Sequence, residues 1–305
     1  MPRESRKRST GRPATPVALA LLALIAVTGI AGVATATPRL MAEPGHPRGE
    51  RQLLVPVSLL DDAGRPQNLT ADGLQVTAAG AALTIASVDA RVPAAVLVVT
   101  DQALPAAAWQ TLAEPLRTLG WLGVVSADPQ MPPVRPAAPL LGGLPLPDAP
   151  EPVAPRPWDA VLAGLERLAV LEGAPPRRVL LVLGDLRGDE ASEHPVATCV
   201  EAARSLAIPV YGVVLPGTAA AARGRLARLA AASGGAVLEA PDASRALATG
   251  LARLASVQGL VVARPDLPLP ATVTVSLADE AVDPARTRVL QRPRGSWRPG
   301  PGLVA

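Results

Sequence analysis

Two short runs of apolar residues, at 94–100 and 179–184, dominate the hydrophobic pattern of the chain. Each is followed at once by an aspartate, Asp101 and Asp185. Apolar runs of this length between turn residues are typical of strands that are buried on both faces. Helical patterns follow both runs, so we expect parallel strands of an α/β sheet. Open sheets of this kind bind ligands at the carboxyl ends of their strands, where both aspartates are predicted to lie.

From residue 92 onward, short apolar runs alternate with helical stripes of apolar residues. This alternation predicts a mostly parallel, Rossmann-like sheet with helices on both of its faces. The expected strands lie at 94–100, 122–126, 179–184, 210–215, 236–239 and 260–263, and the expected helices lie around Trp109, at 158–168, at 195–206, at 218–233 and around Leu251. Thr218 is the expected N-cap of the helix that ends at Ser233.

A small β element is predicted in front of this α/β region. Its strands are expected at 53–60, 73–78 and 82–88, the last two forming a hairpin around Ala79 and Gly80. We therefore divide the chain into a linker (37–50), a small β region (51–90), an α/β domain (91–263) and a C-terminal part (264–305). The α/β domain carries a proline-rich insert at 127–157, and the C-terminal part holds an antiparallel edge strand at 272–277 and a loose tail from 291.

The first 36 residues form a targeting segment. Basic residues at 6–8 precede an apolar stretch from 16 to 36, which ends in Ala34-Thr35-Ala36. This pattern fits a signal peptide cleaved after Ala36, but the stretch is also long enough to remain as a membrane anchor. With either outcome we expect the body to lie outside the cytoplasm. It would be periplasmic or extracellular, or attached to the membrane through this segment alone.

Charge and composition exclude several function classes. The chain of 305 residues is 49% hydrophobic and has a net charge of +3, but residues 1–36 hold five of its 29 basic residues and one of its 26 acidic residues. The remainder therefore has a net charge of −1, which argues against a nucleic-acid partner. The single cysteine, Cys199, forms no internal disulfide and is expected in the core. Neither histidine lies near a candidate nucleophile, so no catalytic residue is assigned.

Four segments, taken in their order along the chain, resemble a von Willebrand factor type A domain of the exported bacterial kind. They are GRPQNLTADGLQV at 64–76, PRPWDAV at 155–161, VLLVLGDL at 179–186 and LAAASGG at 229–235. The resemblance covers residues 51–263 and implies an interaction or adhesion domain.

The same resemblance implies a metal-ion-dependent adhesion site, but this chain departs from its pattern. The family has D-x-S-x-S after the first strand, whereas residues 101–105 read DQALP, and the family's threonine position falls at Pro155. Octahedral Mg²⁺ or Mn²⁺ needs several oxygen ligands. Asp101 and Asp185 are therefore interpreted as a remnant site that binds metal weakly or not at all, and no cofactor is expected.

Three other features have ordinary structural interpretations. The tripeptide Arg187-Gly188-Asp189 has the composition of an integrin-recognition sequence, but it is expected to occur here by chance. Asp159 is expected in the first turn of a helix, where the helix dipole favours an acidic residue. His194 is expected at the start of the helix that follows Pro195.

These observations predict an exported, non-enzymatic protein-interaction module that needs no metal and binds an unknown protein at the cell envelope. One alternative is a metal-dependent adhesion domain that uses Asp101 and Asp185. Another is an α/β hydrolase, which requires a nucleophile with a base in reach. Circular dichroism dominated by β structure would contradict the expected fold.

Overall fold

A computed structural model describes residues 38–61, 63–103, 119–128, 153–263, 267–278 and 282–289. These residues belong to one compact unit of the chain. Four predictions lie outside them: the N-terminal segment 1–36, nearly all of the helix around Trp109, residues 129–152 of the insert and the tail from 291. Within the described ranges, no helix has the length and apolar character that crossing a membrane requires.

A parallel sheet forms the centre of the α/β region, as the sequence predicts. Its strands run in the order β12-β11-β10-β8-β9, and every neighbouring pair is parallel. They are β8 (Ala94–Thr100), β9 (Trp121–Ser126), β10 (Arg177–Gly184), β11 (Val210–Val214) and β12 (Val237–Glu239). Every residue of β8 and β11 is buried, which shows that both faces of the sheet are covered.

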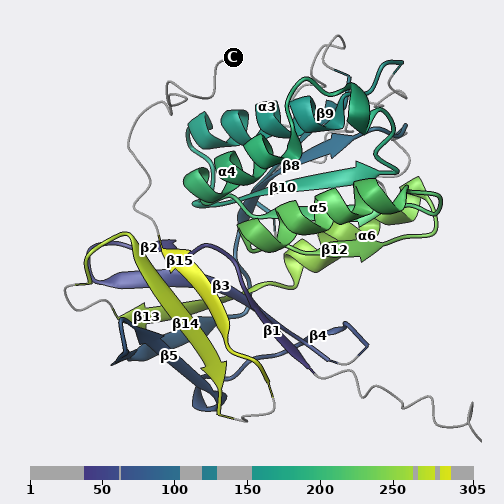
Figure 1. Ribbon diagram of the computed structural model, residues 1–305. Helices are drawn as coiled ribbons and strands as arrows, with labels where there is room; N and C mark the ends of the chain where they lie inside the picture. The colour runs from purple at the N-terminus through teal and green to yellow at the C-terminus, as the bar shows by residue number, and fades with distance from the viewer. Residues whose placement is uncertain are drawn as a thin grey trace, which may run out of the picture. The chain divides into compact units, whose positions relative to one another are not determined.

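Helices cover the two faces of this sheet (Figure 1). Three of them pack on one face and share a core with its side chains: α3 (Pro157–Val170), α4 (Val196–Leu206) and α5 (Ala220–Ser233). The helix α6 (Ala243–Ala255) packs on the opposite face through Leu247, Leu251 and Leu254. The prediction of a mixed α/β fold with helices on both faces is therefore confirmed.

Two helix ends differ from the prediction or add to it. Thr218 does not cap α5, because its hydroxyl donates to the carbonyl of Leu215 and holds a turn there. The residue before α5 is Ala219, which offers no side-chain cap. At the end of α3, the guanidinium of Arg178 donates to the carbonyls of Leu168 and Leu171, and so satisfies groups that a helix end leaves open.

The remaining strands form two antiparallel sheets. The first has the order β1-β3-β13-β7, and the second β15-β14-β5-β6. The first contains β1 (Arg39–Ala42), β2 (His46–Pro47), β3 (Gln52–Leu60), β4 (Pro66–Gln67), β7 (Ile85–Asp89) and β13 (Gln258–Ala263), and the second β5 (Leu74–Ala78), β6 (Ala81–Leu83), β14 (Ala271–Leu277) and β15 (Ala285–Val289). A single cluster of buried apolar residues draws on both sheets. A short 3-10 turn, η1 (Ala71–Gly73), precedes β5.

This β region corrects four sequence predictions. The segment 37–50, interpreted as a linker, contains β1 and β2. The run at 260–263 belongs to β13, which pairs with β3 and β7 rather than with the parallel sheet. The strand at 272–277 is antiparallel but is not an edge, since β14 pairs with β5 and β15. The strand expected at 82–88 divides at Thr84 into β6 and β7, which join different sheets. A hydrophobic pattern indicates that a strand exists but does not identify its partner.

A buried ion pair joins the N-terminal strands to the parallel sheet. Glu43 follows β1, and Arg177 begins β10. Arg177 Nε and Nη2 donate to the two carboxylate oxygens of Glu43 at 2.6 and 2.8 Å. The hydroxyl of Tyr211 donates to the same carboxylate at 2.7 Å, and Arg177 Nη1 donates to the carbonyls of Val92 and Leu254. Burial by itself raises the pKa of Glu43, but Arg177 and the hydrogen bonds outweigh it and hold that pKa below its usual value.

A second guanidinium is buried beside this pair. Arg253 of α6 is only 5% exposed, and its Nη2 donates to the sulfur of Met41. Its Nε and Nη1 have no hydrogen-bond partner in the described part of the chain. Burial lowers the pKa of Arg253, while Tyr211 and Glu43 raise it by smaller amounts. The negative charge of Glu43 therefore acts favourably on two buried guanidinium groups.

We expect Glu43→Gln to destabilise the protein by about 3–5 kcal/mol, because it leaves a buried guanidinium without its counter-charge. Tyr211→Phe removes one hydrogen bond to the same carboxylate and should cost about 1–3 kcal/mol. Urea unfolding measures both changes. The control is Glu239→Gln at an exposed ion pair with Arg223, where a change within about 1 kcal/mol is expected. Equal effects at positions 43 and 239 would contradict the role assigned to the buried pair.

Candidate functional site

Asp101 and Asp185 lie together at the carboxyl edge of the parallel sheet. They directly follow β8 and β10, which are neighbouring strands with Thr100 opposite Leu183. Asp101 is 2% exposed, whereas the side chain of Asp185 is 20% exposed. The sequence therefore places both aspartates correctly. Whether the two carboxylates can bind a ligand depends on which groups their oxygens already contact.

Arg187 bridges the two carboxylates. Its backbone N–H lies 2.9 Å from Asp101 Oδ2 and 3.2 Å from Asp185 Oδ1, and donates to both. Its guanidinium Nε donates to Asp185 Oδ2 at 2.7 Å. The second oxygen of Asp101 accepts a hydrogen bond from the side-chain amide of Gln102 at 3.3 Å. Each carboxylate oxygen of the pair thus has a donor from the chain itself.

Gly184 permits this arrangement. Its φ is +140°, in a region that favours glycine, and a Cβ at this position would lie 1.4 Å from Asp101 Oδ1. Thr100 shapes the loop on the other side, where its hydroxyl accepts from the N–H of Gln102 and donates to the carbonyl of Gln102. Sequence analysis missed the roles of Gly184 and Arg187. The close packing against Asp101 that requires the glycine arises between two strands that are distant in sequence.

The residues present do not fit an octahedral divalent cation. In the sequence, Ala103 and Pro105 stand at the two serine positions of the D-x-S-x-S pattern, and in the structure Arg187 takes up the oxygens of Asp185. Among the described residues, no group of three His, Cys, Asp or Glu side chains is arranged to hold a metal ion. Mg²⁺ and Mn²⁺ require near-complete oxygen shells. The donor set at this edge therefore departs from the one that the family resemblance implies.

The electrostatics of the pair are unusual for a surface loop. Burial raises the pKa of Asp101 to about 6, and the nearby charge of Asp185 adds to this effect. The hydrogen bond from the Arg187 N–H acts in the opposite direction but does not cancel them. At neutral pH the ionised carboxylate of Asp101 therefore destabilises the folded state relative to the unfolded chain.

A third aspartate at this edge was missed by sequence analysis. Asp128 follows β9, is 4% exposed, and accepts a hydrogen bond from the N–H of Ala154 at 3.1 Å. The N–H of Arg156 donates to the carbonyl of Ala127, so the two ends of the proline-rich insert are fastened to each other. The signal was the same as for Asp101 and Asp185: an aspartate just beyond an apolar strand. Next to Ala154 stands Val153, which is 92% exposed.

The Arg-Gly-Asp tripeptide is held by contacts within the chain. Arg187 pairs with Asp185, and Gly188 adopts a left-handed φ of +67° before the 3-10 turn η3 (Asp189–Ala191). The carboxylate of Asp189 pairs with Arg225 of α5. The side chain of Asp189 is only 11% exposed, so it is not presented as a free recognition group.

Asp159 and His194 take the structural positions expected of them. Asp159 lies in the first turn of α3 and accepts from the N–H groups of Glu193 and His194 at 3.0 and 2.9 Å. Its carboxylate also contacts His194 Nδ1 at 2.9 Å. Cys199 is fully buried and donates to the carbonyl of Trp158. Burial raises the pKa of the Cys199 thiol to about 12, with a further contribution from Asp159, so the thiol is protonated at neutral pH.

The raised pKa of Asp101 predicts a pH-dependent stability. Between the unfolded pKa near 4 and the folded value of about 6, the folded protein holds a proton that the unfolded chain has lost. The free energy of unfolding therefore falls as pH rises through this window. Above the window this group causes no further change with pH. We expect Asp101→Asn to match the wild type near pH 4 and to be more stable at pH 8 by about 3 kcal/mol.

Urea unfolding at several pH values from 4 to 8 measures this difference. Asp185→Asn serves as the matched control, because removal of its charge should lower the pKa of Asp101 and move the window to lower pH without abolishing it. A difference between Asp101→Asn and the wild type that stays constant with pH would refute the assignment.

Comparison with known proteins gives distant matches only. No protein-family model matches the chain, and no curated protein does. A von Willebrand factor type A structure from Catenulispora acidiphila is 10% identical over 85% of this chain and 74% of its own, with a TM-score of 0.39. Two structures of proximal thread matrix protein 1 from the mussel byssus are 14% and 12% identical over 55% of this chain and 48% of theirs, with TM-scores of 0.35 and 0.33. The first is named for the family that the four sequence segments resemble, and the fold of this chain is assigned from its own strand order and register.

Proposed function

We propose that this chain is an exported, non-enzymatic interaction module that binds a protein at the cell envelope through the carboxyl edge of its parallel sheet, without a divalent cation. The observation that carries the proposal is the bridge between Asp101 and Asp185. Arg187 supplies hydrogen bonds and a positive charge to the oxygens that a metal-dependent domain would offer to a cation. The export part of the proposal rests on the N-terminal pattern of basic and apolar residues.

The edge also presents groups suited to a protein partner. Val153 is a large apolar residue at 92% exposure, and the side chains of Arg187 and Glu193 are 55% and 71% exposed. In the proposed surface, Val153 supplies the apolar contact and the other two side chains supply polar groups around it. Val153 lies in the loop before α3, and Arg187 and Glu193 lie in the loop between β10 and α4. Asp128 fastens the first loop to the end of β9, and Asp159 fastens the second to α3. Such fastening lowers the entropic cost of ordering a binding surface.

A metal-dependent form of the same module is the second candidate. The observation in its favour is the closeness of two carboxylates, one of which has its pKa raised to about 6. A bound cation would relieve the repulsion between them, provided that it displaced Arg187 from Asp185.

We expect binding to the envelope partner to be lost in Val153→Asp and to persist in EDTA. The full chain, immobilised, is exposed to solubilised envelope proteins, and bound proteins are identified and titrated. Val170→Asp is the matched control. Val170 is also exposed, at 50%, but it ends α3 near the start of β10, at the opposite end of the strands from the site. Loss of one bound protein in Val153→Asp alone supports the proposal. Equal binding by both variants, or binding that requires Mg²⁺, opposes it.

Thermal unfolding separates the two candidates independently of any partner. We expect no shift in Tm when millimolar Mg²⁺ or Mn²⁺ is added to the full chain in place of Na⁺ at equal ionic strength. A ligand at 100 times its dissociation constant would stabilise the folded state by about 2.7 kcal/mol. A clear upward shift that disappears in Asp101→Ala would establish the metal-dependent candidate instead.

A further inference from the structure

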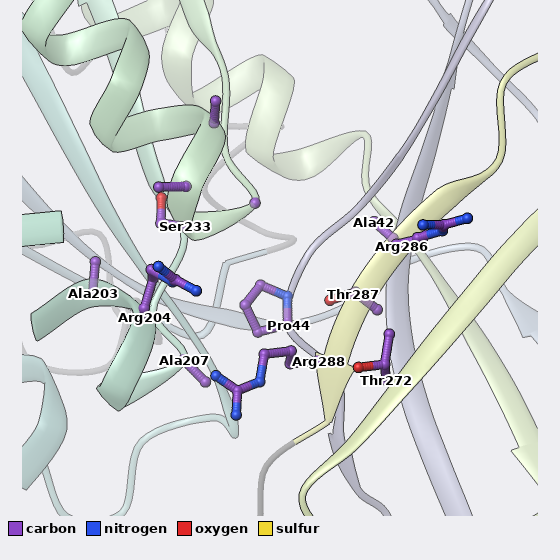
Figure 2. A pocket seen from close by; sticks show the side chains of 13 residues that line it. Ala42, Pro44, Ala203, Arg204, Ala207, Ser233, Thr272, Arg286, Thr287 and Arg288 are labelled. Carbon is purple, nitrogen blue, oxygen red and sulfur yellow. The ribbon is translucent and has the colours of Figure 1, made fainter. Parts of the chain in front are cut away.

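A pocket of about 200 Å³ lies where the carboxyl ends of α4 and α5 approach β14, β15 and the segment after β1 (Figure 2). Its walls come from parts of the chain that are far apart in sequence. Ala207 and Gly234 follow the two helices, Pro44 follows β1, and Thr272 and Arg288 lie opposite each other on β14 and β15. It lies apart from the aspartate pair, since none of the edge residues described above lines it.

Three arginines give this pocket a positive lining. Arg204 lies in the last turn of α4, and Arg286 and Arg288 occupy alternate positions on the exposed face of β15. Figure 2 shows the guanidinium groups of Arg204 and Arg288 extending toward each other across the space beside Pro44, with Arg286 on the far side of Pro44. Within the described ranges, none of the three forms an ion pair, and no acidic side chain lines the pocket.

The arginines are not needed to complete the helix ends. The N–H of Ala207 donates to the carbonyls of Ala203 and Arg204, and the N–H of Gly234 donates to the carbonyl of Ala230. These backbone caps satisfy the last turns of both helices. Each helix end still contributes about half a negative charge through its dipole. The three guanidinium groups carry three positive charges against about one negative charge from the two helix ends together. The pocket therefore keeps a net positive charge of about two.

The walls of the pocket are held in place before any ligand arrives. The hydroxyl of Thr287 donates to the carbonyl of Glu43 at 2.7 Å, and the N–H of Gly45 donates to the carbonyl of Arg288 at 3.0 Å. On the helix side, a Cβ at Gly234 would lie 3.2 Å from the carbonyl of Ala42, which marks a close approach of backbones. Arg204 and Arg288 are therefore mounted on elements that are already fixed relative to each other, which favours binding.

We infer that this pocket binds a phosphate group, supplied either as free inorganic phosphate or as a small phosphomonoester. Guanidinium groups bind phosphate oxygens through paired N–H donors. Two guanidiniums from opposite walls match a doubly charged, tetrahedral anion, whereas one carboxylate would leave a positive charge without a partner. The hydroxyl of Thr272, beside Arg288, is placed to donate to a further oxygen.

Isothermal titration calorimetry of the full chain with inorganic phosphate and with glycerol 3-phosphate, against chloride at equal ionic strength, tests this inference. We expect saturable binding of at least one phosphate probe, and an affinity at least tenfold lower in Arg288→Gln and in Arg204→Gln. The control is Arg245→Gln, an exposed arginine of α6 that does not line the pocket, which should bind as the wild type does.

The two probes distinguish the sources of the phosphate group. Tighter binding of inorganic phosphate identifies the free ion, and tighter binding of glycerol 3-phosphate identifies a phosphomonoester. Thermal unfolding of each variant without ligand shows that the substitutions leave the fold intact. Binding no stronger than that of chloride, or an equal loss in Arg245→Gln and Arg288→Gln, would overturn the inference.

Discussion

The buried ion pair of Glu43 and Arg177 is the contact on which the rest of the arrangement depends. Removing both charges from water is costly, and the pair is stable only because the contact is bidentate and Tyr211 and two backbone carbonyls use the remaining donors and acceptors. Glu43 belongs to the N-terminal segment, Arg177 to the parallel sheet and the Leu254 carbonyl to α6. The backbone carbonyl of Glu43 also accepts a hydrogen bond from the Thr287 hydroxyl of β15. Glu43 thus follows β1 of one antiparallel sheet, contacts the parallel sheet through its carboxylate, and contacts the other antiparallel sheet through its backbone.

Strand β10 carries the consequences of this contact to the other edge of the sheet. Arg177 begins the strand, and Gly184 ends it immediately before Asp185. At one end a buried positive charge is balanced by Glu43. At the other, the guanidinium of Arg187 pairs with Asp185, and the backbone N–H of Arg187 donates to Asp101. The strand therefore links a buried ion pair at one end to a carboxylate at the other end whose charged form is disfavoured by burial. Strained groups held by a rigid scaffold are typical of binding sites.

Local patterns in the sequence were sufficient for the parallel sheet and for the aspartates that follow it. Residues 94–99 and 179–184 are apolar, and runs of this length between turn residues are typical of strands covered on both faces. The helical stripe at Trp158, Leu162 and Leu165 was equally clear, because its spacing belongs to one element. The position of Asp101 beside Asp185 follows from these strands being neighbours.

Long-range partners were not predictable in the same way. The run at 260–263 predicts a buried strand, but nothing in it indicates pairing with β3 instead of the parallel sheet. Glu43 stands among prolines and glycines, which indicate a linker, and its role requires Arg177, which lies 134 residues away. The need for Gly184 likewise depends on a side chain from another strand. Pattern analysis identifies elements, whereas pairing between distant elements is decided by packing and charge.

Differential scanning calorimetry of the full chain tests the central claim, that Glu43 joins the antiparallel sheets and the parallel sheet into one cooperative structure. We expect a single unfolding transition for the described region, with calorimetric and van't Hoff enthalpies that agree. Two separate transitions in the wild-type protein, one for the antiparallel sheets and one for the α/β region, would contradict it.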